Sequence, residues 1–181
     1  MLYVTNSRPY VMQVVGFFAG FHSSPKETHV TAVKTIFKYL KGTMEYGLWY
    51  PKSQDFMLKA FTNADWEGSV DDPKSSSGAT FFLGNCLVSW LSKKKSSISL
   101  SMAEAEYISI GSCCTQVIWM KQTLEDLLVK YEHPIIINCD NTSAINMSKK
   151  LSHAIQDKTH TNKVSLPKRT SIPEGCQTRV C

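Results

Sequence analysis

Long hydrophobic runs are missing from this 181-residue chain. Its apolar stretches are short, and none approaches the roughly 20 residues that a membrane-spanning helix needs. The opening segment Met1–Asn6 has no signal-peptide character. The six cysteines show neither a CxxC pair nor zinc-ligand spacing, which favours reduced thiols in an intracellular protein. We therefore expect a cytoplasmic or nuclear protein with no membrane partner.

A charge excess is also missing from most of the chain, although the formal net charge is +5. Residues 149–181 contain seven lysines and arginines against two acidic residues, which accounts for the whole excess. Residues 1–148 are balanced, with thirteen basic and thirteen acidic side chains. The overall charge is therefore weak support for nucleic-acid binding by the folded part.

Three segments differ in their hydrophobic pattern. Apolar residues recur at helical spacing over residues 11–21 and 29–40, and a short strand pattern follows at 46–50. The last thirty residues have no apolar period and contain two prolines and a glycine. We predict a helical segment over 1–50, a folded domain over 51–150, and an irregular or disordered basic tail over 151–181.

The middle segment alternates between strand and helix patterns. A glycine and an asparagine at 84–85, between two apolar runs, are a signal for a two-residue hairpin. Three antiparallel strands and a long helix would return, by a right-handed crossover, to a strand parallel to the first. This order predicts the α/β class, with a mixed sheet of three antiparallel strands and one parallel strand. The expected elements are strands 57–62, 78–83, 86–91 and 135–139 and helices 102–129 and 142–148.

Glu106 is a carboxylate in line with the apolar face of the predicted long helix. Ser101 and Glu104 have the spacing of a capping box, which gives Glu104 a structural role. Glu106 has no such role, so its side chain must reach water, pair with another group or bind a cation. The apolar positions in line with it are Ile110, Cys113 or Cys114, Val117, Met120, Leu124 and Leu127 or Leu128.

Polar residues follow two neighbouring strands of the predicted sheet. Asn63 and Asp65 come at the end of one strand, and Asp140 ends the strand parallel to it. The two ends meet at one sheet edge, which Glu106 in the first helical turn would overlook. Acids that converge in this way can hold two Mg²⁺ ions about 3.5–4 Å apart. The structural alternatives are that Asp140 caps the following helix and that Asp65 is a turn residue.

A basic cluster, Lys93, Lys94 and Lys95, lies between the hairpin and the long helix. In a loop these side chains could contact a nucleic-acid phosphate backbone. The alternative is a solvated turn without a partner, and the spacing favours neither.

Motifs spread along the chain in one register carry a family resemblance. They are Tyr39–Thr43, Tyr46–Leu48, Ala64–Trp66, Asp72–Gly78, Phe82–Asn85, Ser89–Trp90, Ser92–Lys94, Ser101–Tyr107, Cys139–Asn141 and Ser143–Ile145. With them, roughly residues 1–160 resemble the ribonuclease H region of copia-type LTR retrotransposon Pol polyproteins. Thr5–Pro9 resembles the segment that follows the polymerase in those proteins.

The resemblance implies a ribonuclease H-like fold that hydrolyses the RNA strand of RNA/DNA hybrids with two Mg²⁺ ions held by four acids. Position by position, it makes Glu106 and Asp140 the second and third acids, as catalytic and metal-binding residues. The first acid position is Asn63, whose amide supplies no negative charge. The fourth acid has no counterpart, and we expect the last sheet strand to be missing from a C-terminally truncated domain that lacks its polymerase partner.

These observations predict a retroelement Pol fragment with impaired catalysis. One alternative is an active metal-dependent nuclease in which Asp65 is a substitute ligand or a second copy completes the site. Another is a domesticated module that binds nucleic acid or protein, for which the apolar helices within residues 11–40 offer a surface.

Overall fold

The computed structural model describes residues 2–52, 56–66, 74–96, 98–131 and 133–156. Contacts divide the chain into two units, one ending at Tyr50 and the other beginning at Pro51. Within the described ranges, none of the helices has the length and apolar character needed to cross a membrane.

Three helices form the first unit: α1 (Leu2–Ser7), α2 (Pro9–Ala19) and α3 (Glu27–Gly42). The second and third confirm the helices expected at 11–21 and 29–40. Proline is favoured in the first helical turn because the N–H that it lacks would have no partner there, and α2 begins at a proline. A small core joins α2 to α3 and contains Val11, Val15 and Ile36.

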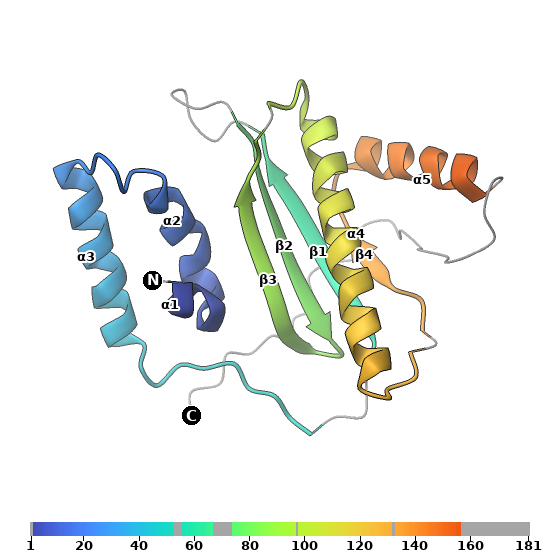
Figure 1. Ribbon diagram of the computed structural model, residues 1–181, viewed down its shortest axis with the longest axis horizontal. Coiled ribbons are helices and arrows are strands. Elements are labelled where there is room, and N and C mark those ends of the chain that lie inside the picture. Colours follow the sequence, from blue (N-terminus) through green and yellow to red (C-terminus); the bar gives the residue numbers. More distant parts are fainter. Residues whose placement is uncertain (1, 53–55, 67–73, 97, 132, 157–181) are drawn as a thin grey trace. The chain divides into compact units, whose positions relative to one another are not determined.

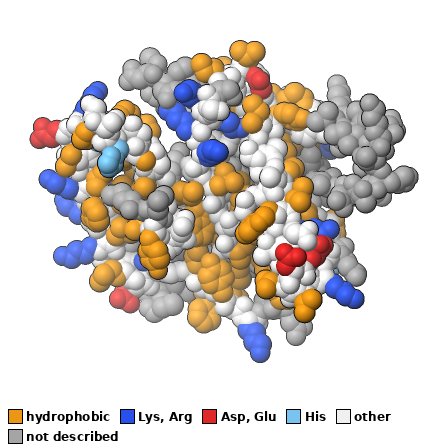
Figure 2. Space-filling model, viewed as in Figure 1, with side chains coloured by type: hydrophobic (Ala, Val, Ile, Leu, Met, Phe, Trp, Pro, Cys, Tyr) orange, Lys and Arg blue, Asp and Glu red, His pale blue; other side chains and the backbone are white. Residues whose placement is uncertain are grey.

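The strand expected at residues 46–50 is not formed. Tyr46 makes an isolated bridge, and the next four residues have no strand pairing. Trp49 and Tyr50 are 63% and 54% exposed, so the apolar side chains that suggested a strand stay largely in solvent. Hydrophobic side chains are scattered over the molecular face shown in Figure 2.

A four-stranded mixed sheet forms the centre of the second unit (Figure 1). The first three strands are antiparallel, and the fourth lies parallel to the first. This arrangement confirms the mixed sheet predicted from the sequence. The strands are β1 (Leu58–Asp65), β2 (Ser76–Leu83), β3 (Cys86–Lys94) and β4 (Ile136–Asn138), in the order β3-β2-β1-β4.

The predicted hairpin turn joins β2 to β3, and Gly84 in that turn has a φ of 60°, which glycine adopts without strain.

β1 extends further than expected. At the far end of the β1–β2 ladder, Asn63 pairs with Gly78 and Asp65 with Ser76. Asp65 is therefore a strand residue rather than a turn residue, because pairing with β2 continues to this point.

Helix α4 (Met102–Asp126) packs on one face of the sheet. It begins as predicted, because Ser101 Oγ accepts a hydrogen bond from the Glu104 N–H at 3.2 Å. The Glu104 carboxylate accepts the Leu100 N–H at 2.7 Å, one residue before the N–H that a capping box uses. The core between helix and sheet includes Leu58, Phe81, Cys113, Val117 and Ile137.

α4 ends three residues before the predicted limit at Val129. Leu128 adopts a φ of 63°, and its N–H donates to the Glu125 carbonyl at 2.9 Å, which closes the helix. Leu127 and Leu128 were expected to continue the apolar stripe. They are instead 68% and 91% exposed, because the chain leaves the helix before it can bury them.

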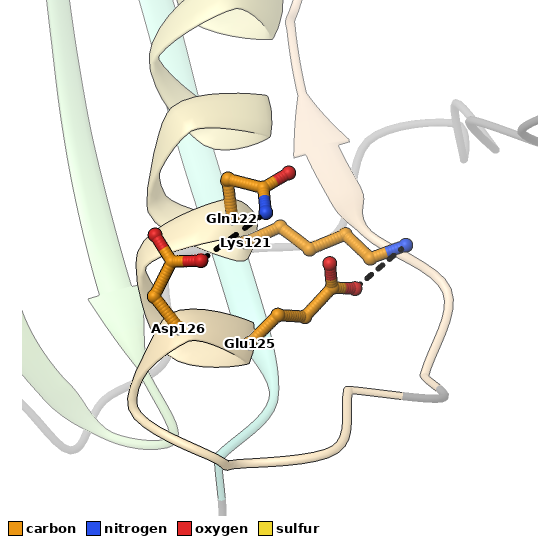
Figure 3. Close-up of polar contacts among 4 residues, drawn as sticks. All are labelled: Lys121, Gln122, Glu125 and Asp126. Atoms are coloured by element: carbon orange, nitrogen blue, oxygen red, sulfur yellow. Dashed lines mark hydrogen bonds and ion pairs between the residues drawn. The ribbon is translucent and has the colours of Figure 1, made fainter.

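The last turns of α4 carry two side-chain pairs (Figure 3). Lys121 Nζ lies 3.6 Å from Glu125 Oε1, and Gln122 Nε2 donates to Asp126 Oδ1 at 3.4 Å. Surface pairs four residues apart contribute only about 0.3–0.5 kcal/mol each. The stability of α4 therefore rests on its packing against the sheet.

Helix α5 (Thr142–Gln156) is longer than the helix predicted at 142–148. Residues 151–156, which we assigned to the irregular tail, are helical. The physical reason is that no proline or glycine interrupts the chain between the start of α5 and Gln156. The rest of the predicted tail, residues 157–181, lies outside the described residues.

Candidate metal centre beside two strand ends

Glu106 is a buried carboxylate near the start of α4, with 2% of its surface exposed. Its Oε1 accepts a hydrogen bond from the Ala64 N–H at 2.8 Å. Its Oε2 accepts one from the Cys139 thiol, with the sulfur 3.7 Å away. Of the outcomes considered for this side chain, the structure therefore shows pairing inside the protein rather than contact with water.

The position of Ala64 explains why a carboxylate is accommodated here. The described pairing of β1 with β4 stops at Phe61 opposite Asn138. The Ala64 N–H lies three residues further along β1 and takes its acceptor from α4 instead. A buried N–H without an acceptor is costly, so Glu106 satisfies a backbone group that an apolar residue would leave unpaired.

Cys139 and Asp140 complete a cluster with Glu106. One potential ligand atom of each residue lies within 4.8 Å of the others. Cys139 is 5% exposed and Asp140 is exposed, and both directly follow β4. Sequence reasoning placed the two carboxylates together but did not include the thiol. The available signal was its place directly before Asp140 at a strand end.

Asn141, rather than Asp140, caps α5. Its Oδ1 accepts a hydrogen bond from the Ala144 N–H at 3.0 Å. The structural role that we considered for Asp140 is therefore taken by its neighbour. The Asp140 carboxylate is left exposed beside Glu106, where a cation from solution can reach it.

Burial raises the pKa of Glu106, and the nearby charge of Asp140 adds to this shift. The Ala64 N–H, the Cys139 thiol and the Lys95 ammonium act in the opposite direction, because each favours the charged carboxylate. Burial also raises the pKa of Cys139 to about 11. This thiol is therefore protonated at neutral pH and must lose its proton before it can bind a metal.

The donor set fits one divalent cation better than a pair. Two carboxylates and a thiol within 4.8 Å of one another can surround a single ion. Carboxylate oxygens suit Mg²⁺ or Mn²⁺, whereas a thiolate suits softer ions. Among the described residues only two carboxylates meet here, which is few for two closely spaced dications.

Asn63 and Asp65 are not brought into this cluster. Both are exposed, and along β1 they alternate with Thr62 and Ala64, which are buried. Thr62 Oγ1 lies 2.7 Å from Ser109 Oγ of α4, so the buried face is the face that α4 covers. Strand alternation therefore places Asn63 and Asp65 on the opposite face. The strand ends meet as expected, but Asp65 does not join Glu106 as a substitute ligand in this arrangement.

The three lysines do not form one loop. Lys93 and Lys94 are the last residues of β3 and are exposed, whereas Lys95 follows the strand and is half-buried. β3 continues through Lys93 and Lys94 because their backbones still pair with β2. Beside the same end of the sheet, Trp66 donates its indole N–H to the Ser99 carbonyl at 3.0 Å.

The chain is similar to curated retroelement proteins. It is 33% identical over 142 residues to the retrovirus-related Pol polyprotein from transposon RE2 of Arabidopsis thaliana. It is 37% identical over 143 residues to the retrovirus-related Pol polyprotein from transposon TNT 1-94 of Nicotiana tabacum. These matches cover 78% and 79% of this chain but only 10% and 11% of the relatives.

A shorter relative is matched over most of its own length. The chain is 35% identical over 114 residues to the secreted RxLR effector protein 161 of Plasmopara viticola, which covers 63% of this chain and 80% of that protein. No family model matches the chain, and no solved structure matches it.

These similarities support a retroelement Pol fragment. Its homologues at 33–37% identity, over 78–79% of this chain, are copia-type retrotransposon Pol polyproteins. The chain spans about a tenth of the length of the curated polyproteins that it matches.

Proposed function

We propose that this chain corresponds to the ribonuclease H region of a Pol polyprotein and that its hydrolysis of RNA in RNA/DNA hybrids is impaired. The homology to Pol polyproteins supports the first part. The mixed sheet, with a parallel strand beside β1, is compatible with a ribonuclease H-like fold. The observation that supports the second part is the cluster itself, to which the described residues contribute only two carboxylates, those of Glu106 and Asp140.

The impairment follows from charge. Hydrolysis by this class of site depends on divalent ions, which activate a water molecule and stabilise the leaving oxygen. Here Glu106 and Asp140 would hold one such ion, Mg²⁺ or Mn²⁺. Asn63 carries no charge, and its side chain lies on the other face of β1. The chain would therefore bind a single ion weakly and turn over slowly.

A cleavage assay on a labelled RNA/DNA hybrid in Mg²⁺ and in Mn²⁺ tests this proposal. We expect cleavage well below that of an intact ribonuclease H, and any residual cleavage should disappear in Glu106→Gln. Vigorous cleavage that is lost in Glu106→Gln would overturn the impairment. If it is lost in Asp65→Asn as well, the active alternative with Asp65 as a ligand would be supported.

A second candidate function is binding of the hybrid without cleavage. Its support is the pair of exposed lysines, Lys93 and Lys94, at the end of β3. Fluorescence anisotropy with a labelled hybrid at increasing salt measures it, since each phosphate contact contributes to the salt dependence. We expect Lys93→Met to weaken binding and to reduce that dependence. Salt-independent binding, or none, would leave only a protein-interaction role.

The first unit offers a surface for such an interaction. Tyr10 and Phe37 are 69% and 57% exposed on α2 and α3. In a longer polyprotein, these side chains would pack against the polymerase part that precedes them. Coexpression with a polymerase segment of the same element, followed by co-purification of wild type and of Tyr10→Ser, would test this role.

A further inference from the structure

Two buried polar atoms stand out in the second unit. Among the side chains that the structure describes, Ser77 Oγ and Lys95 Nζ are buried atoms without a hydrogen-bond partner. Ser77 is 3% exposed and belongs to β2, and Lys95 follows β3. A buried ammonium without a partner is unfavourable unless another charge compensates it.

Strand register places both side chains on the sheet face that α4 covers. In β2, the buried Ser77 alternates with half-buried neighbours and lies on the same face as the buried residues Ala79 and Phe81. The ladder continues one step beyond β3, because the Lys95 N–H donates to the Ser75 carbonyl at 2.9 Å. Residues opposite each other in a ladder project to the same face. Lys95 therefore shares the face of Ser75, which is fully buried.

This face also contains Glu106. Ser77 is paired with Ala64, the residue whose N–H donates to the Glu106 carboxylate at 2.8 Å. Burial lowers the pKa of Lys95, and the charge of Glu106 opposes that shift. The charge of Lys95 in turn favours the ionised form of Glu106. The surroundings of the carboxylate thus include the Lys95 ammonium as well as the exposed Asp140 carboxylate.

We propose that Lys95 is an internal counter-ion of Glu106 and that its ammonium lowers the affinity of the Glu106, Cys139 and Asp140 cluster for divalent cations. A dication that binds Glu106 must approach a positive charge that is already buried nearby. The lysine thus supplies part of the charge that a metal ion would otherwise bring. This inference builds on the metal centre of the proposed function but does not require nuclease activity.

The proposal is tested by measuring Mn²⁺ binding to the full chain with isothermal titration calorimetry and with water-proton relaxation. We expect Lys95→Met to bind Mn²⁺ about tenfold more tightly than wild type because a repulsive charge is removed. Lys95→Arg keeps the charge and should match wild type. Lys59→Met is the matched control, since it removes an equal charge from β1 on the face away from α4. Equal affinities of wild type and Lys95→Met would overturn the proposal.

A second measurement decides the outcome if no variant binds Mn²⁺ measurably. Urea unfolding of wild type, Lys95→Met, Glu106→Gln and the double variant gives a metal-free test of the same charge pair. We expect Lys95→Met to lower the urea midpoint clearly in the wild-type background and much less in the Glu106→Gln background. Additive shifts would overturn the counter-ion role. Vigorous hybrid cleavage together with non-additive shifts would instead refute only the impairment in the proposed function.

Discussion

The Glu106 carboxylate and the Ala64 N–H are joined by a hydrogen bond of 2.8 Å that ties α4 to the end of β1. This contact gives one side chain two roles. It satisfies a backbone donor beyond the described β1–β4 ladder, and it places a candidate metal ligand beside Asp140. A substitution at Glu106 therefore has to be judged by both stability and cation binding.

Removal of the acceptor should be more harmful than removal of the charge. Glu106→Ala leaves the Ala64 N–H buried and unpaired, which we expect to lower the free energy of unfolding by about 1–3 kcal/mol. Glu106→Gln keeps an acceptor oxygen and should retain most of this stability. Urea unfolding near neutral pH measures both. Equal losses would contradict the prediction, and the surface variant Glu125→Gln should change stability by less than about 0.5 kcal/mol.

The raised pKa of Glu106 predicts a pH dependence of stability. The Glu106 carboxyl keeps its proton to a higher pH in the folded protein than in the unfolded chain, where it has the ordinary glutamate pKa of 4.5. The stability from this group is therefore complete below that pH and is lost as pH rises through the raised pKa. Unfolding free energies of wild type and Glu106→Gln should diverge over this window. Parallel curves would contradict it, and Glu125→Gln should follow wild type.

Leu128 is predicted to be a strained position. Its φ of 63° is unfavourable for a side chain with a Cβ, and its side chain is 91% exposed. Leu128→Gly should raise the free energy of unfolding by about 0.5–1 kcal/mol in a thermal or urea melt. Leu127→Gly is the matched control, because Leu127 has a φ of −83° and gains nothing from glycine. A stability loss in both variants would count against this account.

Asn141 is predicted to stabilise α5 through its cap. Asn141→Ala removes the acceptor of the Ala144 N–H and should cost about 1 kcal/mol, whereas Asn141→Asp should keep the cap. Helical circular dichroism together with urea unfolding measures both. Asn146→Ala, an exposed position inside the same helix, is the control and should be close to neutral. An unchanged Asn141→Ala would indicate that another group, such as Asp140, takes over the cap.

The buried thiols are predicted to react slowly with alkylating reagents. Burial raises the pKa of Cys113 to about 12 and that of Cys139 to about 11, so little thiolate forms at neutral pH. Mass spectrometry after a short iodoacetamide pulse should find Cys86, which is half-buried at the hairpin, modified before Cys113 and Cys139. Denaturation should remove the difference. Rapid modification of Cys139 in the folded protein would contradict the buried cluster.

Local patterns predicted much of the fold. The Gly84–Asn85 turn, the Ser101 cap and the apolar period of α4 all depend on neighbours within a few residues. The structure confirms the turn and the cap, and it confirms the apolar period except at Leu127 and Leu128, which lie beyond the end of α4. The errors occur where longer contacts act. Pairing with β2 carries β1 through Asp65, whereas the pattern at residues 46–50 lacks the strand partner that would hold it in a sheet.

The sequence alone was sufficient to identify Glu106 as an unusual carboxylate and to place Asp140 near it, because helix periodicity and strand order are local or topological properties. It could not assign the neighbours of Glu106. Ala64 and Cys139 donate hydrogen bonds to that carboxylate and Lys95 interacts with its charge, across separations of 42, 33 and 11 residues along the chain. Only packing of α4 on the sheet brings those groups together, and burial then makes their charges and hydrogen bonds strong enough to matter.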